Sequence, residues 1–500
     1  MSRTSIVVAP SAAHRTRYTV TVLLLALALI VSTIAATLLH SPLAAAAEGD
    51  VHMIPGVIEA EDYTSGGYND ATPGNVGRAY RADDVDLETA FSGSWEPTGV
   101  NVGWIDAGEW LSYQTLVEQG GSYTFTLKVA TPFDGRQVRI ELNGQTIVND
   151  LALPNTGGWQ SWTLVQSAPV YIRPGQHTLR VLMDTGELNI DSISVNPLTC
   201  GDGARTVNVG TAADLTTALT TAQPGDVIRL ADGVYTGRFY MTQSGTPEQP
   251  ITLCGGRGAQ LQSPDMGVHD ALHLRSNYTV IQGFSIAWAK RGIEAQNAHF
   301  NVIRDMDIHH TGQEAIHLRN NSTDNIVESS WIHDTGQNGR LEIGEGIYLG
   351  TDSSQWGTIT GGTPDQSDRN SVMTTTFGPN VSAEMVEGKE GTTGGLIQGN
   401  VFIGDGMLQG HDTINAWVAI KGNAYRVVGN EGLGSAFHGF RVFSDDIPDN
   451  GRDNVFTRNV ARVHAGGVGF WVSNKVTGTI ISCDNVVEDA AGGFASIPCQ

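Results

Sequence analysis

The residues best suited to chemistry lie in the short segment 383–389, which combines two carboxylates with one ammonium group. Glu384, Glu387 and Lys389 stand there among small and apolar residues. Carboxylate oxygens are ligands that calcium prefers. A lysine binds anionic groups as a cation, and it becomes a base where neighbouring cations lower its pKa. The segment therefore predicts a site that holds calcium through Glu384 and Glu387 and acts on an acidic molecule.

Three further side chains extend this candidate site. Lys421 and Arg441 can hold a carboxylate or assist a leaving oxygen, but arginine is a poor base because it stays charged. Histidine titrates near neutral pH, which makes His317 the reserve base. Because these residues are far apart in sequence, a repeated element has to bring them together.

Such an element is predicted from residue 250 onward. Alternating strands are expected at 272–275, 293–296, 316–319, 347–350, 386–389, 418–421, 440–443 and 470–473, and a pair of aliphatic residues follows most of them. A basic period of 21–23 residues with strands throughout is typical of a parallel β-helix. Leucine-rich repeats are the rival, but their Leu/Asn spacing is absent.

Two further features fit a parallel β-helix over 204–500. A helix over 212–222 would cap its N-terminal end. Asn301, Asn325 and Asn454 precede aliphatic pairs, and we expect them to stack at one turn of successive coils.

The predicted strands place one set of side chains on an outward face. Side chains alternate along a strand, so the second and fourth residues face outward when the first and third are apolar. Five of these sixteen residues are Lys or Arg and two are acids. This pattern predicts a basic stripe that includes Arg319 and Tyr348 as substrate-binding residues and suits a uronic-acid polysaccharide. The alternative is a solvated sheet face with scattered charges. Insertions at 331–345, 352–382 and 403–416 would form walls beside the stripe.

This half of the chain resembles known polysaccharide lyases. Residues 225–235 (GDVIRLADGVY) resemble the start of secreted β-helix lyases, and segment 383–389 (AEMVEGK) resembles the core motif of polysaccharide lyase family 6. The resemblance implies a right-handed β-helix, calcium on Glu384 and Lys389 as the base for β-elimination. Lys421 stands where that family has a catalytic arginine, and Ser382 stands where it has a second calcium carboxylate.

The segment 52–197 has a different pattern. Short alternating strands at 102–105, 110–113, 123–129, 138–142, 162–165, 178–183 and 190–195 are mostly separated by turn residues. About eight strands at this spacing predict an antiparallel β-sandwich.

The sandwich segment resembles carbohydrate-binding module family 6. The resemblance rests on IEAEDY (58–63), VGWI (102–105), GEWL (108–111), GGWQ (157–160), GQHTL (175–179) and NID (189–191). It implies a jelly roll in which Trp104 and Trp159 sandwich a sugar ring and Asn189 binds it. It also implies a structural calcium on Glu59, Glu61 and Asp191. The alternative is that the two tryptophans belong to the core, for which Trp110 and Trp162 are better candidates.

Charge, cysteines and the N-terminus bound the remaining possibilities. The 500 residues include 52 acidic and 29 basic residues, and a net charge of −23 disfavours nucleic acid as a partner.

Residues 1–47 combine arginines, an apolar run and Ala44–47, as in a cleaved signal peptide, with a retained membrane anchor as the alternative. We expect a secreted monomer without stable membrane association after cleavage. Export permits disulfides, expected as Cys200–Cys254 and Cys483–Cys499, whereas zinc is disfavoured by the cysteine spacing.

Together these patterns predict a secreted all-β protein of two domains. The function expected is β-elimination of an acidic polysaccharide, with the substrate as its partner and calcium as its cofactor. Two alternatives remain open at this point: a glycoside hydrolase on the same β-helix and a non-catalytic glycan-binding protein.

Overall fold

The computed structural model describes residues 51–94, 96–117, 120–201, 204–411, 414–445 and 447–500. The expected signal peptide at 1–47 lies outside these residues. Within the described ranges, no helix is both long and apolar enough to cross a membrane. The protein is all-β as predicted, with 44% of residues in strands and 5% in helices.

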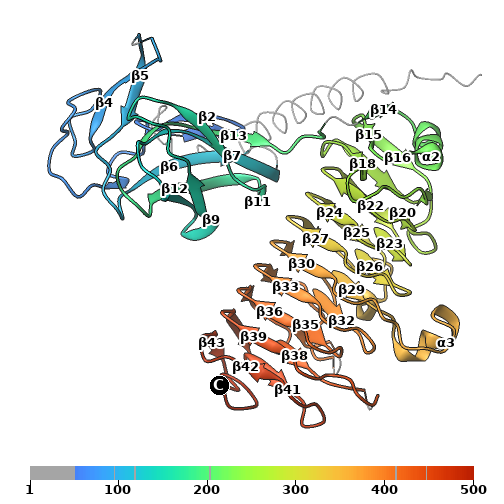
Figure 1. Cartoon of the computed structure of the whole chain (residues 1–500). Helices are drawn as coiled ribbons and strands as arrows, with labels where there is room; N and C mark the ends of the chain where they lie inside the picture. The colour runs from blue at the N-terminus through green and yellow to red at the C-terminus, as the bar shows by residue number, and fades with distance from the viewer. Residues whose placement is uncertain (1–50, 95, 118–119, 202–203, 412–413, 446) are drawn as a thin grey trace, which may run out of the picture. The chain divides into compact units, whose positions relative to one another are not determined.

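Residues 51–197 form a β-sandwich of two antiparallel sheets, which confirms the predicted fold (Figure 1). One sheet has the order β1-β6-β12-β8-β9, with β3 beside β6: β1 (Val51–Ile54), β3 (Tyr68–Asn69), β6 (Trp110–Val117), β8 (Arg136–Leu142), β9 (Gln145–Leu153) and β12 (Gly175–Met183). The other has the order β10-β7-β13-β5-β4, with β11 beside β7 and β2 beside β13: β2 (Gly56–Glu59), β4 (Leu87–Phe91), β5 (Pro97–Val102), β7 (Gly121–Ala130), β10 (Thr163–Gln166), β11 (Val170–Ile172) and β13 (Asn189–Pro197). Alternating apolar residues of the two sheets, such as Phe125 and Leu127 of β7 and Leu179 and Val181 of β12, are fully buried between them.

One predicted strand of the sandwich is wrong. Strand β5 ends at Val102, and the chain turns at 103–105 instead of continuing as a strand. Trp104 has a φ of 49°, which is outside the strand region. The turn leaves the indole of Trp104 on the surface.

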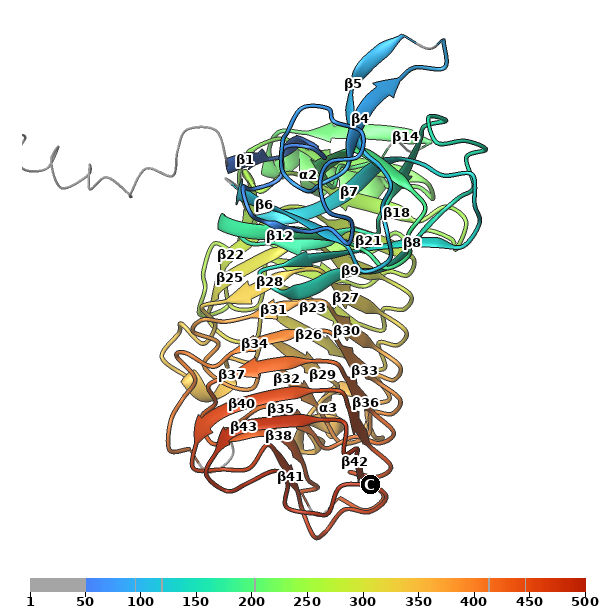
Figure 2. The same ribbon diagram turned by 90° about the vertical axis from the view of Figure 1, so that its left-hand side faces the viewer.

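From Arg205 onward the chain coils into a parallel β-helix with three sheets (Figure 2). The first strand, β14, pairs with β15, and from β15 to β40 each strand pairs with the third strand after it. In the described part of the chain, the eleven-strand sheet contains β14 (Arg205–Val209), β15 (Asp226–Leu230), β18 (Ile251–Cys254), β21 (Thr279–Gln282), β24 (Val302–Arg304), β27 (Ile326–Glu328), β30 (Ser371–Met373), β33 (Leu396–Gln398), β36 (Arg426–Val428), β39 (Val455–Thr457) and β42 (Ile480–Ile481). The ten-strand sheet, over the same described residues, contains β16 (Gly233–Thr236), β19 (Ala259–Gln262), β22 (Ser285–Ala289), β25 (Asp307–Thr311), β28 (Trp331–His333), β31 (Thr376–Phe377), β34 (Val401–Ile403), β37 (Glu431–Leu433), β40 (Val460–Ala465) and β43 (Val486–Ala490).

The nine-strand sheet contains all eight strands predicted from the sequence. Counted over the described ranges, its members are β17 (Phe239–Met241), β20 (Leu272–Leu274), β23 (Ile293–Gln296), β26 (Ile316–Arg319), β29 (Ile347–Leu349), β32 (Val386–Gly388), β35 (Ala416–Ile420), β38 (His438–Val442) and β41 (Phe470–Val472). The register is also as predicted, since Ile316 pairs with Ile347, which pairs with Val386. These apolar residues are fully buried in the coil, so the residues between them face outward.

Buried asparagine ladders connect successive coils at two turns. Asn301 donates to Asn325, which donates to Asn370. Asn454 occupies the same turn of a later coil. It is not bonded to the ladder of Asn301, Asn325 and Asn370, because the coil before it has Tyr425 in place of an asparagine. A second ladder, which the sequence did not predict, joins Asn400, Asn430, Asn459 and Asn485. Glycines make room for Tyr425, since a side chain at Gly395 would overlap its ring.

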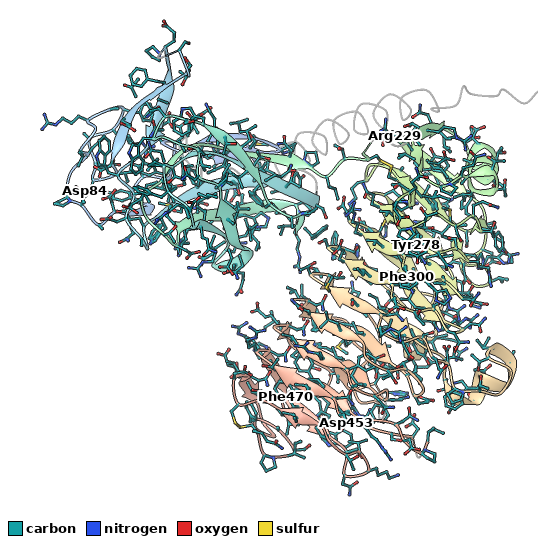
Figure 3. All side chains as sticks on the ribbon, viewed as in Figure 1. Asp84, Arg229, Tyr278, Phe300, Asp453 and Phe470 are labelled. Carbon is teal, nitrogen blue, oxygen red and sulfur yellow. A yellow bond between two sulfur atoms is a disulfide. The ribbon has the colours of Figure 1, made fainter. Side chains whose placement is uncertain are left out.

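Aromatic side chains also stack from coil to coil. Phe440 and Phe470 lie parallel in the core with ring centres 5.1 Å apart. Tyr278 and Phe300 do the same at two successive surface turns, also at 5.1 Å (Figure 3). Stacking of this kind is expected where parallel strands repeat in register about 4.8 Å apart.

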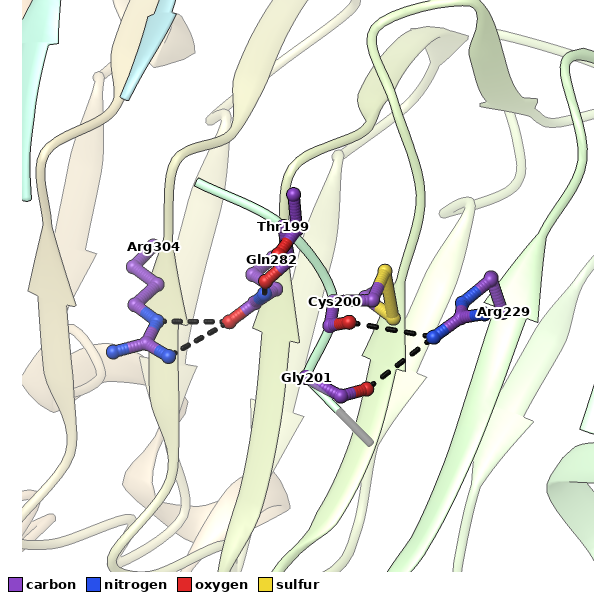
Figure 4. Close-up of a disulfide and its surroundings, with 7 residues drawn as sticks. Thr199, Cys200, Gly201, Arg229, Gln282 and Arg304 are labelled. Carbon is purple, nitrogen blue, oxygen red and sulfur yellow. Dashed lines mark hydrogen bonds between the residues drawn. A yellow bond between two sulfur atoms is a disulfide. The ribbon is translucent and has the colours of Figure 1, made fainter. Parts of the chain in front are cut away.

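A helix and two disulfides lie at the ends of the coil, as predicted. Helix α2 (Ala212–Thr221) starts at Thr211, whose side chain accepts a hydrogen bond from the Asp214 amide, and it buries Leu215 and Leu219 in the β-helix core. The disulfides Cys200–Cys254 and Cys483–Cys499 are both present. Figure 4 shows the first of them beside Arg229, which donates to the carbonyl groups of Cys200 and Gly201.

Part of the inserted chain forms regular secondary structure. The predicted wall segments 331–345 and 352–382 include the coil strands β28, β30 and β31, so the added chain is shorter than expected. It contains η1 (Leu341–Ile343), η2 (Ser353–Gln355) and α3 (Trp356–Ile359).

Candidate functional site

A cavity of about 340 Å³ opens on the outer face of the nine-strand sheet. Its lining comes from strands β29 and β32, from the residues that directly follow β32, β35 and β38, and from the turns and insertions beside them. The lining residues are Glu342, Ile343, Glu345, Tyr348, Asp352, Glu384, Glu387, Lys389, Ile414, Lys421, Phe443 and Asp445. We call this cavity the lysine pocket.

The pocket brings Lys389 and Lys421 together. Each lysine directly follows its strand and is almost fully buried. The ammonium groups lie 3.5 Å and 3.3 Å from the same oxygen, Glu387 Oε1. On the pocket side, Lys389 Nζ is 3.0 Å from Asp352 Oδ2, and Lys421 Nζ is 2.8 Å from Asp445 Oδ2. Two cations on neighbouring coils thus share one carboxylate and each holds a second.

The condition under which Lys389 would be a base, a pKa lowered by neighbouring cations, is not met. Burial lowers the pKa of this ammonium group, but Glu387 and the other negative neighbours outweigh burial and hold it well above its ordinary value. The role of Lys389 as a base depended on neighbouring cations, whereas the structure places the carboxylates of Asp352 and Glu387 beside it. Lys389 is therefore a cation in this arrangement.

Three buried glutamates form a candidate metal site in the floor of the pocket. Glu345, Glu384 and Glu387 each offer a carboxylate oxygen within 4.8 Å of the others. Burial and the neighbouring carboxylates raise the pKa of Glu345 well above its ordinary value and that of Glu384 to about 8. Burial also raises the pKa of Glu387, but the two lysines outweigh it and the net shift is downward. Glu345 Oε2 is buried without a hydrogen-bond partner, so a cation with oxygen ligands fits this site.

Glu345 belongs to a column of side chains that the sequence analysis did not use. In most strands of the nine-strand sheet, a charged or titratable residue stands two positions before the first residue that points into the coil. The column reads Asp270, Arg291, Glu314, Glu345, Glu384 and His438, and all but Arg291 are buried. The recurrence was visible in the sequence, but it lies outside the alternating strand pattern.

A similar cluster nearer the N-terminus is neutralised by arginines. Asp270, His273 and Glu294 also lie within 4.8 Å of one another. Arg319 and Arg275 contact Glu294, and Arg291 is 3.6 Å from Asp270. Burial raises the pKa of Glu294, but His273 and Arg319 outweigh it and the net shift is strongly downward. Arg319, a predicted substrate-binding residue, is thus engaged with a carboxylate outside the lysine pocket.

The predicted basic stripe is wrong for the lysine pocket. Six carboxylates and two lysines line it. The additional acids come from the neighbouring column and from the loops, which a prediction based on the strands alone leaves out. The two lysines are charged groups within an acidic cavity.

The other predicted site residues lie at or beside the pocket. Tyr348 lines it, with Lys389 Nζ 5.3 Å from its ring centre. His317 packs against Tyr348, donates from Nε2 to the Gly350 carbonyl and holds Nδ1 3.2 Å from Glu314, a geometry that does not favour a base. Arg441 stacks over Phe443, one of the lining residues.

The sandwich carries the second predicted site. Trp104 and Trp159 are 48% and 44% exposed, which excludes both from the core. The buried Asn189 amide donates to Glu88 Oε1 and to the Trp159 carbonyl, and Gln160 donates to the same Glu88 oxygen. Two exposed indoles and a buried amide network can bind a sugar through its apolar face and its hydroxyl groups. Glu88 and Gln160 were not predicted.

The acids predicted to hold calcium in the sandwich also interact. Burial raises the pKa of Glu61 to about 7, and the charges of Glu59 and Asp191 add to this. Glu61 Oε2 is buried without a hydrogen-bond partner, whereas Asp191 pairs with Lys128 at 3.0 Å. The unpaired buried oxygen makes this cluster suitable for a cation.

Comparison with protein families identifies the sandwich. Residues 78–197 match the family model described as carbohydrate binding module (family 6). Among curated proteins, the clotting factor G alpha subunit of Tachypleus tridentatus is 29% identical over 102 residues, which are 20% of this chain and 15% of that protein. The chain therefore spans only a small part of that relative.

Solved structures resemble both parts of the chain. An alginate lyase from Paenibacillus sp. str. FPU-7 is 30% identical, with a TM-score of 0.55, over 58% of this chain and 98% of that one. The C-terminal family 6 module of LamC, a laminarinase from Zobellia galactanivorans, is 30% identical over 28% of this chain and 98% of that one, with a TM-score of 0.23.

Proposed function

Because the chain contains a family 6 carbohydrate-binding module and a β-helix similar to an alginate lyase, we propose that it is a secreted enzyme that cleaves a uronic-acid polysaccharide by β-elimination. The observation that carries this proposal is the lysine pocket, where two buried ammonium groups meet at one carboxylate on the outer face of the sheet. The alginate lyase resemblance supports a uronan as the substrate class.

The first requirement of β-elimination is to neutralise the sugar carboxylate. The proton on the adjacent carbon is only weakly acidic while that carboxylate keeps its charge. Lys389 and Lys421 act as the neutralising cations, since carboxylates raise the pKa of Lys389 and keep it charged. Arg441, stacked beside the pocket on Phe443, can contact the next carboxylate of the chain.

The second requirement is a group that moves the proton. Tyr348 lines the same pocket and lies beside the Lys389 ammonium group. As a phenolate it takes the proton from the carbon next to the carboxylate, and the C–H electrons form the new C=C bond. The bond to the 4-linked oxygen breaks, and the phenol returns the proton to that oxygen.

A divalent cation, which we propose to be calcium, would be held by Glu345, Glu384 and Glu387. The buried Glu345 oxygen without a partner supports this assignment. When bound, the cation would supply a fixed positive charge near the substrate carboxylate. In the cluster of Asp270 and Glu294, arginines already neutralise the carboxylates, so we assign no metal ion to it.

Glycoside hydrolysis is not favoured by the pocket. Hydrolases hold two carboxyl groups about 5–9.5 Å apart on either side of the bond. Glu345 and Glu387, on neighbouring coils, have oxygens within 4.8 Å and lie in one buried cluster. The lysines engage the more exposed carboxylates, Asp352 and Asp445.

The sandwich has a separate role in this proposal. Trp104, Trp159 and Asn189 bind a glycan and keep the enzyme near its polymer, while a calcium ion on Glu59, Glu61 and Asp191 stabilises the module. The two disulfides are consistent with export to an oxidising compartment, and we propose that the secreted protein is a monomer.

The test combines an ultraviolet assay for unsaturated ends with a reducing-end assay on alginate, pectate and chondroitin. We expect both signals on at least one uronan and a smaller rate after chelation. Reducing ends without ultraviolet absorbance would show a hydrolase. Neither signal would show a non-catalytic glycan-binding protein.

A further inference from the structure

Both pocket lysines are already bound to carboxylates from surface loops. Asp352 lies in the insertion after β29, and its side chain is 41% exposed, whereas that of Lys389 is 4% exposed. Asp445 lies in the turn after β38 and is 48% exposed, whereas Lys421 is 9% exposed. The difference in exposure places each aspartate on the solvent side of its ion pair.

The two ion pairs have the same construction on neighbouring coils. Glu387 contacts both ammonium groups from within the protein, and the loop aspartates contact them from the pocket mouth. Asp352 Oδ1 accepts hydrogen bonds from the amide and hydroxyl of Ser354, which fixes Oδ2 toward Lys389. The insertion is also tied to the strand end, because the Ser353 amide donates to the buried Glu390. The Asp352 carboxylate is thus held in place by the fold.

These contacts have a consequence for binding. An ammonium group has three N–H donors, and each loop aspartate takes a donor that faces the cavity. A neutral sugar hydroxyl cannot replace the charge of an aspartate on a buried cation, but a sugar carboxylate can.

We propose that Asp352 and Asp445 occupy the positions that sugar carboxylates take on Lys389 and Lys421, so that only an acidic chain displaces them and enters the pocket. This inference rests on the proposed function and assigns the two aspartates as specificity-determining residues. When the acidic chain binds, a sugar carboxylate replaces the aspartate carboxylate at each lysine, and the loop aspartates turn to solvent.

The experiment measures binding of acidic hexasaccharides to full-length variants by calorimetry at fixed calcium concentration. Tyr348→Phe prevents turnover in all samples, and Trp104→Ala with Trp159→Ala removes binding by the sandwich. The probes are hexamers from alginate, pectate and chondroitin, with cellohexaose as the neutral comparison. Asp352→Asn and Asp445→Asn are added one at a time, because asparagine keeps the shape of aspartate and its ability to cap the turn at Ser354.

We expect each substitution to tighten binding of an acidic hexamer about fivefold, equivalent to about 1 kcal/mol, and to leave cellohexaose unchanged. Two matched controls remove a negative charge without touching a lysine. Asp449→Asn changes a residue of the Asp445 turn that pairs with Arg452, and Asp324→Asn changes an acid outside the pocket that pairs with Arg369. Both controls should change affinity less than twofold.

The outcomes separate this inference from the proposed function. Unchanged or weaker binding of every acidic hexamer by both variants overturns the inference, and so does equal tightening by the controls. Tighter binding without unsaturated ends from the wild-type chain supports the inference and removes the lyase proposal. If Asp352→Asn does not fold, Asp445→Asn decides alone, because it lies in a different loop.

Discussion

At the scale of single residues, the pocket is defined by the positions of charges relative to one another. Glu387 lies between Lys389 and Lys421 and raises the pKa of Lys389, and its own pKa is lowered because the two lysines outweigh its burial. Burial and the neighbouring carboxylates raise the pKa of Glu345 and Glu384, and at Glu384 they outweigh the opposing charges of Lys421 and Arg441. A single residue type thus has two protonation states within one cluster.

Lys389 is the residue whose loss should affect catalysis most. Removing a charge that stabilises the transition state costs about 100- to 1,000-fold in kcat. We expect Lys389→Ala to lower kcat on the cleaved uronan by about this factor while sugar binding by the sandwich is unchanged. Lys475→Ala, at an exposed lysine, is the matched control. Turnover within threefold of wild type would remove Lys389 from the site.

The pH profile should report on Tyr348. Burial and Glu387 raise the pKa of this phenol well above its ordinary value, so only a small fraction is phenolate at neutral pH. That fraction rises about tenfold per pH unit, while the lysine stays charged because its pKa is raised too. We therefore expect kcat/KM to rise with pH from 7 to 9. Tyr348→Phe should abolish turnover over the whole range, and a flat wild-type profile would contradict the proton-transfer role.

Calcium binding should release protons. The pKa of Glu384 is about 8, so this carboxyl is largely protonated at pH 7 without a cation. A cation must displace the proton, and its affinity should increase as the pH rises from 6 to 8. Calorimetry in two buffers of different ionisation enthalpy measures the release, with Glu61→Gln used to silence the sandwich site. Binding without proton release, or binding that Glu384→Gln leaves unchanged, would exclude this site.

The same carboxyl should link stability to pH. Its pKa is higher in the folded chain than in the unfolded chain, so the folded state holds more protons between the two values. Without calcium, the chain should therefore lose stability as the pH rises from about 5 to 8. Thermal unfolding with a chelator at these two pH values checks the direction, and added calcium should reduce the difference.

At the scale of elements, the β-helix depends on repeated hydrogen bonds at its turns. Asn430 accepts bonds from the amide and side chain of Asn400, and it donates to the Ile397 carbonyl and to Asn459. A buried polar group that loses its partner costs about 1–3 kcal/mol. Loss of the Asn430 side chain leaves groups without a hydrogen-bond partner on the coil before it and on the coil after it, so this cost applies on both sides.

Breaking the ladder should therefore destabilise the coil. We expect Asn430→Ala to reduce the free energy of unfolding by about 2–4 kcal/mol. Asn149→Ala, at an exposed asparagine of the sandwich, should have little effect. Chemical denaturation followed by circular dichroism measures both variants. Equal unfolding midpoints would show that the ladder is not a main source of stability.

At the scale of the whole molecule, binding and cleavage are assigned to different folds. The sandwich presents exposed indoles over a network of amides, and the β-helix presents charged groups in a cavity. This division predicts that the two activities can be removed separately.

Loss of the indoles should impair polymer degradation more than oligosaccharide cleavage. We expect Trp104→Ala with Trp159→Ala to weaken polysaccharide binding at least tenfold and to leave kcat on short oligomers within twofold. Trp288→Ala is the matched control, because this β-helix tryptophan is 47% exposed and lies outside the pocket. Affinity gels and steady-state kinetics measure the two effects. An equal loss on oligomers and polymer would contradict the division.

The sequence alone determined the all-β class, the sandwich, the β-helix strands and both disulfides. Local patterns are sufficient for these features, because alternation and a repeat of 21–23 residues specify which side chains are buried. They are also sufficient to place Lys389 and Lys421 on one face. The asparagine ladder at Asn400–Asn485 and the column through Glu345 were present as repeats, but they lie at turns, where alternation gives no signal.

Only the tertiary structure decided the charge balance of the site. Asp352 and Asp445 reach the lysines from loops, and Glu345 reaches Glu387 from the preceding coil. The pKa of a buried group depends on distances of a few ångströms to such neighbours, and the sequence does not contain those distances. The raised pKa of Lys389, and with it our proposal that Tyr348 transfers the proton, therefore depends on the folded chain.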